Sequence, residues 1–134
     1  MGVQKNVIMI RFLNKNDKKE LNNLIKIALN EKMLIVKKKN HHFFGYFEDN
    51  KLVGVVGFFT MKRFKTIGFV SAFVLPEYRG KGIYDKLSKE RLEYCQQHYN
   101  GFIIFITTNN KSRPQMEKIG FKLIEQQYRM YLNI

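Results

Sequence analysis

The spacing of hydrophobic residues predicts a strand and then a helix at the start of the chain. Residues 7–13 are apolar except for Arg11, and the run is short enough for a strand. Further on, apolar residues recur at the i, i+3, i+4, i+7 spacing of an amphipathic helix. These residues are Leu21, Leu24, Ile25, Ala28 and Leu29. Asp17 is the expected N-cap of this helix, and Glu20, three residues later, completes the pattern of a capping box.

Three apolar runs joined by polar segments follow, as is typical of consecutive antiparallel strands. They cover residues 43–48, 52–61 and 66–75. Asp49-Asn50 has the composition of a hairpin turn between the first two runs. The third run ends before Pro76, because proline has no N–H group to donate to a strand ladder.

The last third of the chain alternates between helix and strand. Helical spacing over 80–97 predicts a helix that ends at Asn100-Gly101. Residues 102–106 predict an apolar strand that we expect to be buried on both faces. Residues 112–118 predict a short helix, and residues 128–134 predict a last strand. The sequence therefore predicts a single domain over residues 1–134. It is of the α/β class, with the order β-α-β-β-β-α-β-α-β and a mixed, mainly antiparallel sheet flanked by helices.

Composition narrows the class of protein. The 134 residues include one Cys and three His, which excludes an internal disulfide and leaves little for a zinc site, so we expect no metal. No apolar run approaches the roughly 20 residues of a membrane-spanning helix, and no secretory signal pattern is present. We therefore expect a cytoplasmic protein that does not enter the membrane. The net charge of +13 indicates attraction to anions, such as nucleic acid, an anionic cofactor or an acidic substrate.

The segment Phe-Val-Leu-Pro-Glu-Tyr-Arg-Gly-Lys-Gly-Ile-Tyr, residues 73–84, carries the clearest chemistry. A strand leads through a cationic turn with two glycines directly into a helix. Gly80 and Gly82 let the backbone approach a ligand closely. The helix adds unpaired N–H groups and the positive end of its dipole, and Arg79 and Lys81 add formal charge. The segment therefore predicts a site for a di- or triphosphate-like anion.

Two common phosphate-binding motifs do not fit this segment. A P-loop requires Gly, four residues and then Gly-Lys-Ser/Thr, which the chain lacks. A dinucleotide fingerprint requires a third Gly where Asp85 stands.

The segment resembles the acyl-CoA-binding motif of the GNAT N-acetyltransferase superfamily. That motif reads Gln/Arg-x-x-Gly-x-Gly/Ala and follows a strand that ends Val-x-Pro. Val74-Leu75-Pro76 matches the strand end and residues 79–83 match the motif, whereas Tyr84 replaces the final Gly or Ala. A second element, Asn109-x-x-Ser112 followed by Gly120-Phe121, is similar to another helix of the family. The order of elements resembles this GNAT-like fold over nearly the whole chain.

The resemblance implies acetyl-CoA as the acyl donor. It implies that backbone groups around Phe73 and Val74 hold the acetyl carbonyl and the pantetheine arm, that residues 79–84 cradle the pyrophosphate, and that Asn109 reaches the thiol end. The implied cofactor-binding residues are Phe73, Val74, Arg79, Gly80, Lys81, Gly82, Ile83, Tyr84, Asn109 and Ser112.

Acyl transfer to an amine needs a base for the ammonium and a group that stabilises the oxyanion. Glu48 is the first candidate base, because its strand would lie beside the cofactor strand; the alternative is a solvent-facing turn residue. Ser71 shares a strand face with Phe73 and is a candidate substrate contact, or else a satisfied core hydroxyl.

The leaving thiolate also needs a proton, and here the chain departs from the family. Met116 stands where many members carry a tyrosine credited as the general acid. Ser112, Tyr84, Tyr128 or a water molecule would then have to supply the proton, although Tyr84 could equally point into solvent or the core.

Three functions follow from these residues. The first is an N-acetyltransferase that acts on the amine of an unidentified small molecule or protein. The second is a transferase that acts on a DNA or tRNA base, with the clusters 37–39 and 62–65 on phosphates and the aromatic residues Phe43, Phe44 and Phe64 stacked on bases. The third is an inactive CoA-binding protein, suggested by Met116. The apolar run 128–132 leaves monomer and homodimer both open.

Overall fold

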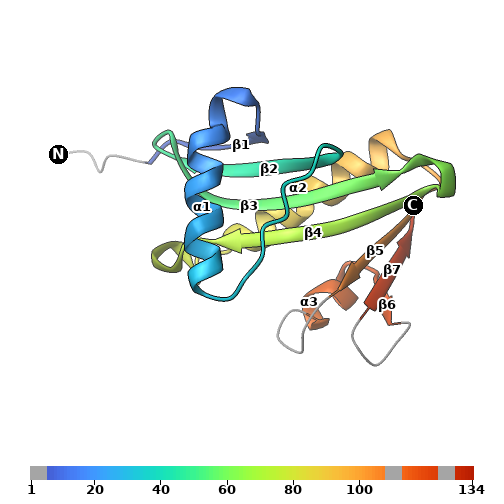
Figure 1. Ribbon diagram of the computed structural model, residues 1–134. Helices are drawn as coiled ribbons and strands as arrows, with labels where there is room; N and C mark the ends of the chain where they lie inside the picture. The colour runs from blue at the N-terminus through green and yellow to red at the C-terminus, as the bar shows by residue number, and fades with distance from the viewer. Residues whose placement is uncertain (1–5, 108–112, 124–128) are drawn as a thin grey trace.

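A seven-stranded mixed sheet organises the protein, whose computed structural model describes residues 6–107, 113–123 and 129–134 (Figure 1). The sheet order is β1-β2-β3-β4-β5-β7-β6, and every neighbouring pair is antiparallel except β4–β5. The strands are β1 (Ile8–Phe12), β2 (His41–Glu48), β3 (Lys51–Met61), β4 (Thr66–Val74), β5 (Ile103–Thr107), β6 (Lys122–Leu123) and β7 (Arg129–Asn133). The helices are α1 (Lys18–Asn30), α2 (Ile83–His98) and α3 (Arg113–Lys118), and the 3-10 turns are η1 (Lys15–Asp17), η2 (Lys62–Phe64) and η3 (Pro76–Tyr78).

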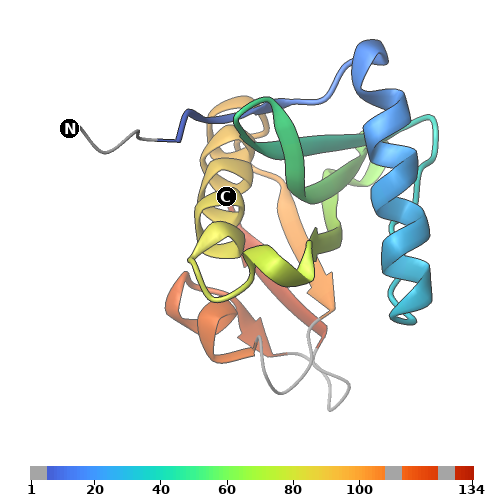
Figure 2. The same ribbon diagram turned by 90° about the vertical axis from the view of Figure 1, so that its left-hand side faces the viewer.

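Helices α1 and α2 cover opposite faces of strands β2 to β4 (Figure 2). The apolar stripe predicted for α1 points inward at Leu21, Leu24 and Ala28, and α2 buries Leu87 and Cys95. Because both faces are covered, β2 and β3 contain long runs of consecutive buried residues where a half-exposed sheet would alternate. The core is therefore a three-layer stack of helix, sheet and helix.

Strand β4 parts from β5 halfway along its length. The parallel register joins Thr66 to Ile103 and ends at Phe69 and Ile106, beyond which the two strands diverge (Figure 1). On its other edge β4 remains paired with β3 as far as Val74. The divergence leaves residues 70–74 of β4 without a neighbouring strand on the β5 side, which opens the sheet there.

The predicted order of elements is confirmed, with β6 as an addition. Its two residues give too little pattern to be found from sequence. The hairpin at Asp49-Asn50 is also confirmed, since both residues have positive φ (51° and 67°), as the tightest hairpin turns require. The expectation that β5 is buried on both faces is wrong, because only Ile104 and Ile106 are buried while the alternate residues are half-exposed or exposed.

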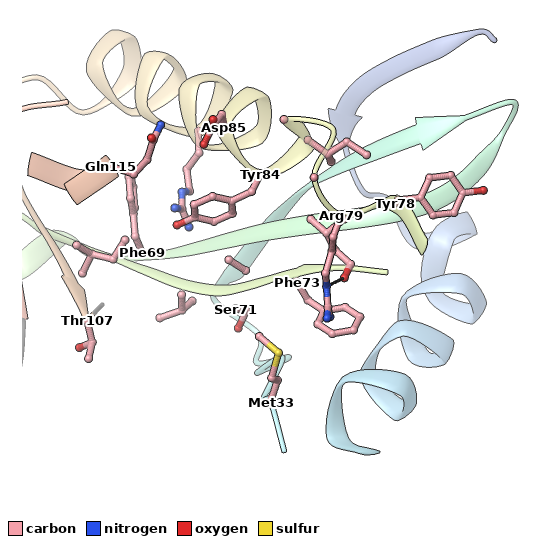
Figure 3. A pocket seen from close by; sticks show the side chains of 18 residues that line it. Met33, Phe69, Ser71, Phe73, Tyr78, Arg79, Tyr84, Asp85, Thr107 and Gln115 are labelled. Atoms are coloured by element: carbon pink, nitrogen blue, oxygen red, sulfur yellow. Dashed lines mark hydrogen bonds between the residues drawn. The ribbon is translucent and has the colours of Figure 1, made fainter. Parts of the chain in front are cut away.

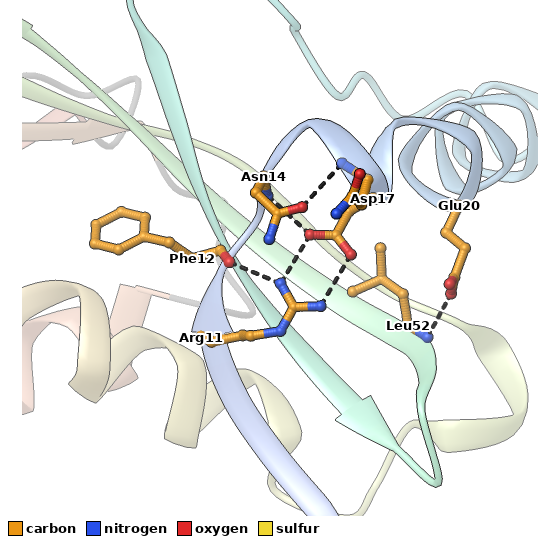
Figure 4. A network of polar contacts seen from close by, with 7 residues as sticks. Arg11, Phe12, Asn14, Asp17, Glu20 and Leu52 are labelled. Carbon is orange, nitrogen blue, oxygen red and sulfur yellow. Dashed lines mark hydrogen bonds and ion pairs between the residues drawn. The ribbon is translucent and has the colours of Figure 1, made fainter.

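The predicted capping box at the start of α1 is also wrong (Figure 4). The box forms one turn earlier, around η1, where the Asn14 side chain accepts from Asn16 N and the Asn14 N–H donates to Asp17 Oδ2 at 2.8 Å. Asp17 also accepts two hydrogen bonds from the Arg11 guanidinium, at 2.8 and 2.9 Å. Glu20, the expected partner, instead accepts from the backbone N–H of Leu52 on β3.

Candidate active site

A cavity of about 720 Å³ lies where β4 and β5 diverge (Figure 3). Residues 69–74 of β4 form one wall, and the loop before α2 and the first turns of α2 form another. Thr107 at the end of β5 and Gln115 on α3 also line it, and Met33 contributes from the segment after α1. Because one half of β4 has no neighbouring strand on this side, its peptide groups face the cavity edge.

The loop before α2 has the backbone that its two glycines predict. Gly80 and Gly82 have φ values of 79° and 77°, a region that favours glycine, although an added Cβ at either position would meet no atom within 4 Å. Gly82 is the N-cap of α2 and provides no side-chain capping bond. The first-turn N–H groups of a 16-residue helix are therefore left for water or for a ligand. This geometry is suited to binding a phosphate-like anion.

Arg79 is engaged within the protein. Its Nε donates to Val74 O at 2.9 Å, while Nη1 and Nη2 donate to the two carboxylate oxygens of Glu31 at 2.9 and 3.0 Å. The guanidinium also lies 5.4 Å from the centre of the Phe73 ring. Arg79 thus connects the segment after α1 to the end of β4, next to residues 80–82, which we call the glycine loop.

Ser71 marks a β-bulge in β4. Val55 pairs with Phe73 and Gly57 pairs with Val70, so Ser71 and Ala72 together oppose a single residue of β3. Ser71 has a φ of 62°, which is uncommon for a residue other than glycine. Its Oγ accepts the backbone N–H of Val36 at 2.8 Å, which anchors the segment after α1 to the bulge.

Tyr84 and Arg91 both line the cavity from α2. The Tyr84 ring extends from the helix toward β4 (Figure 3). Arg91 is only 1% exposed; its Nη1 donates to Gly57 O at 3.0 Å and its guanidinium carbon lies 4.0 Å from the centre of the Phe69 ring. Burial lowers the pKa of Arg91 to about 10, an effect that the nearby Tyr84 hydroxyl partly opposes. Arg91 therefore remains a cation at neutral pH.

Most of the cofactor residues expected from the sequence meet at this cavity. Those that line it are Phe73, Val74, Arg79, Gly80, Gly82, Ile83 and Tyr84. Lys81 does not line it, and its ammonium lies 5.2 Å from the Tyr78 ring centre. Asn109 and Ser112 lie outside the described residues.

The catalytic candidates are divided by the structure. Ser71 and Tyr84 line the cavity. Glu48 does not; it lies at the end of β2, and its carboxylate accepts a hydrogen bond from Asn6 Nδ2 at 2.7 Å. Met116, noted as the replacement for a tyrosine, is fully buried and does not line the cavity either, whereas its neighbour Gln115 does.

Sequence reasoning missed Arg91. The signal was present, because Leu87, Arg91 and Cys95 follow one another at four-residue spacing on the buried face of α2. A charged residue in an apolar stripe requires a special partner or a function. Gln115 and Met33 carried no such signal, since only the fold brings them to the cavity.

Within residues 6–107, 113–123 and 129–134, no three His, Cys, Asp or Glu side chains gather closely enough to hold a metal ion. Over the same ranges, no helix is both long and apolar enough to cross a membrane.

Residues 12–131 match the family described as the acetyltransferase (GNAT) domain. The chain belongs to this family. No curated protein shows significant sequence similarity to it. The resemblance inferred from residues 73–84 is thus confirmed by a match that spans almost the entire GNAT chain.

Solved structures agree on the GNAT fold. A GNAT acetyltransferase from Staphylococcus aureus is 19% identical with a TM-score of 0.72, and the match covers 95% of this chain and 99% of that one. The PaiA N-acetyltransferase of Thermoplasma acidophilum, solved with coenzyme A, is 15% identical with a TM-score of 0.71, covering 96% and 99%. A GNAT acetyltransferase of Brucella melitensis, solved with acetyl-CoA, is 18% identical with a TM-score of 0.68, covering 96% and 88%.

Proposed function

We propose that the protein is an acetyl-CoA-dependent N-acetyltransferase that acts on an amine of a small molecule or a protein. The observation that carries this proposal is the glycine loop at residues 80–82, which borders a cavity of about 720 Å³. The cavity lies beside residues 70–74 of β4, which have no neighbouring strand on the β5 side. The loop and the α2 N-terminus suit a pyrophosphate, and the peptide groups of β4 suit the amides of a pantetheine arm. Family members solved with coenzyme A and acetyl-CoA support the same donor.

The residues present fit the chemistry of a thioester donor. Acetyl-CoA supplies an activated acetyl group when bound, and the chain must orient it and stabilise negative charge on the carbonyl oxygen. Backbone N–H groups near Phe73 and Val74 are the candidates for that role, since this part of β4 borders the cavity. We assign the proton for the leaving sulfur to the Tyr84 hydroxyl, because Tyr84 lines the cavity and Met116 is fully buried outside its lining.

Calorimetric titration with coenzyme A and acetyl-CoA tests donor binding. Gly82→Asp places a carboxylate at the proposed phosphate position and should abolish binding of both ligands. Gly101→Asp is the matched control, because Gly101 also has a positive φ (89° against 77°), with no atom within 4 Å of an added Cβ. The control carries comparable backbone strain in the turn after α2 and should bind normally. Equal binding by wild type and Gly82→Asp would refute the phosphate loop.

Transfer itself is tested by a screen of amine acceptors in which the release of free CoA thiol is measured. Acceptor-dependent release supports the transferase. Tight binding of acetyl-CoA with no release for any small amine, peptide or protein acceptor would favour the inactive CoA-binding alternative.

Transfer to a nucleic-acid base is less well supported by the site. Phe43 and Phe44, expected from the sequence to stack on bases, are each only 6% exposed and belong to the core. Phe64 is 62% exposed, with the Arg63 guanidinium 5.6 Å from its ring centre. Fluorescence anisotropy with labelled RNA and DNA tests this alternative; strong binding at low salt that falls steeply as salt rises would restore it.

A further inference from the structure

The inner wall of the cavity contains a buried cation without a counter-ion. Arg91 is 1% exposed, and no described residue forms an ion pair with it. Asp85, the one acidic residue among those described that line the cavity, is not paired with it. By contrast, Arg79, the other arginine at this cavity, is compensated by Glu31.

The guanidinium of Arg91 is only partly satisfied. It offers five N–H donors. One is used by Gly57 O, and the Tyr84 hydroxyl lies near the guanidinium as a neutral polar neighbour. The ring face of Phe69 covers the group at 4.0 Å, and Nε has no hydrogen-bond partner. A buried charge is costly unless it is paired and hydrogen-bonded. An unpaired arginine in the wall of a ligand cavity is therefore best explained by an anionic group of the ligand.

The position of Arg91 separates this anion from the pyrophosphate. Arg91 follows Ile83, the first residue of α2, by eight residues, or about 12 Å along the helix at 1.5 Å per residue. It contacts Phe69, which pairs with Ile106 where β4 and β5 are still joined. Arg91 therefore lies near the point where β4 and β5 are still paired, which we call the closed end of the cavity. The proposed phosphate loop instead follows the C-terminal end of β4, where the two strands are no longer paired.

We propose that Arg91 binds a carboxylate of one of the two substrates at the closed end of the cavity. The carboxylate belongs either to the acyl group of the donor, as in a succinyl or malonyl thioester, or to the amine acceptor. A guanidinium is suited to a carboxylate because its planar donors match the two oxygens. The inference rests on the proposed function for the identity of the two substrates. It adds the requirement that one of them carries a carboxylate.

The donor arm of the test uses the intact protein. Calorimetry compares succinyl-CoA with butyryl-CoA, which has the same four-carbon chain without the carboxylate, and with coenzyme A as the baseline. If the carboxylate is on the donor, succinyl-CoA should bind about tenfold or more tightly than butyryl-CoA, as a charged hydrogen-bonded pair is worth at least this factor.

The acceptor arm keeps acetyl-CoA as donor and compares amino acids with their amides, which differ only in the carboxylate. Release of CoA thiol measures kcat/KM for each pair. If the carboxylate is on the acceptor, the acids should exceed the amides by about tenfold or more. Absence of a carboxylate preference in both arms overturns the proposal without any mutation.

Two variants then locate the effect. Arg91→Met removes the charge at similar length and should abolish whichever preference is found, while affinity for coenzyme A itself stays within about twofold, because the phosphates bind elsewhere. If this variant does not fold, Arg91→Lys keeps the charge without the planar fork and should reduce the preference. A preference that persists in a folded variant overturns the assignment to Arg91.

Binding of coenzyme A to the wild-type protein separates failure of the proposed function from failure of the carboxylate site. If coenzyme A does not bind to the wild-type protein, the acyl-CoA site is wrong, and the carboxylate site is tested with succinate alone by thermal unfolding. Stabilisation of the wild type by succinate but not by sodium chloride of equal ionic strength supports a carboxylate at Arg91, if Arg91→Met or Arg91→Lys removes it. No stabilisation overturns the carboxylate site as well.

Discussion

Arg79 and Glu31 form a two-pronged ion pair, with N–O distances of 2.9 and 3.0 Å, that joins the residue after α1 to the loop before α2. Arg79 is the first residue of the segment that matches the acyl-CoA motif, yet its guanidinium faces a carboxylate of the same chain. It follows that Arg79 must either exchange Glu31 for a phosphate or serve to hold the loop in place.

Replacing Glu31 distinguishes these two roles. If Arg79 exchanges partners, Glu31→Gln removes the competing carboxylate and should tighten binding of coenzyme A several-fold, with a steeper dependence on salt. Calorimetry at two salt concentrations measures both effects. Glu77→Gln is the matched control, since Glu77 is an exposed glutamate of η3 in the same region and loses the same charge. Weaker binding by Glu31→Gln alone would instead assign Arg79 a positioning role.

Ser71 provides a second prediction, on stability. Ser71→Ala leaves the N–H of Val36 without its 2.8 Å acceptor and retains a side chain at a φ of 62°. We expect a loss of about 1–3 kcal/mol in the free energy of unfolding. Ser71→Gly loses the same hydrogen bond but relieves the strained φ, so it should be less destabilising than alanine in urea unfolding. If Ser71→Gly were the more destabilised variant, strain at the bulge would not contribute.

The same two variants test Ser71 as a substrate contact. Its Oγ already accepts one hydrogen bond, which leaves its proton free to be donated toward the cavity that it lines. A fall in kcat/KM for the folded variants, beyond that explained by stability, would support a contact with the acceptor. Unchanged kinetics would leave Ser71 a purely structural residue.

The elements that could be predicted are those whose signal is local. The periodicity of α1, the Asp49-Asn50 hairpin and the glycine loop of residues 80–82 each follow from neighbouring residues, and all three are found. The capping box at Asp17 was misplaced because a residue 32 positions away competes for Glu20: the Leu52 N–H lies 2.9 Å from its carboxylate. Local propensity cannot anticipate such a partner.

The cavity was only half predictable for the same reason. The end proposed to hold phosphates is a contiguous motif, whereas the rest of the lining includes Met33, Phe69, Arg91 and Gln115, which come from four separate segments of the chain. Glu48 was selected because its strand was expected to lie beside the cofactor strand. In the sheet, however, β3 lies between β2 and β4, so Glu48 is two strands away from β4, the strand expected to hold the cofactor.

The pair of Arg11 and Asp17 gives a third prediction, on pH. Hydrogen bonds from Arg11 are the largest cause that lowers the pKa of Asp17 below its ordinary value of 3.8. A folded-state pKa below the unfolded value means that the carboxylate stabilises the protein above pH 4 and that this contribution is lost as the pH falls through the lowered pKa.

Asp17→Asn should therefore reduce the free energy of unfolding at pH 7, and the difference from wild type should shrink as the pH is lowered below 4. Urea unfolding between pH 7 and pH 3 measures the trend. Glu90→Gln, which removes a charge from the exposed surface of α2, should show little difference at any pH. A difference for Asp17→Asn that does not depend on pH would mean that the carboxylate acts through packing.

Tyr84 provides the last prediction and bears on the chemistry. Tyr84→Phe keeps the ring that lines the cavity and removes only the hydroxyl. If this hydroxyl protonates the leaving sulfur, kcat should fall by about 100-fold, a typical contribution of general acid catalysis, while affinity for acetyl-CoA changes little. Tyr84→Ala introduces a residue that the family motif prefers at this position. It should lower kcat to the same extent as Tyr84→Phe, because the hydroxyl is lost in both. It should bind acetyl-CoA at least as tightly as the wild type, because the ring no longer occupies the cavity wall. An unchanged kcat in Tyr84→Phe would show that the proton comes from another group, and weaker binding by Tyr84→Ala would show that the ring packs against the cofactor.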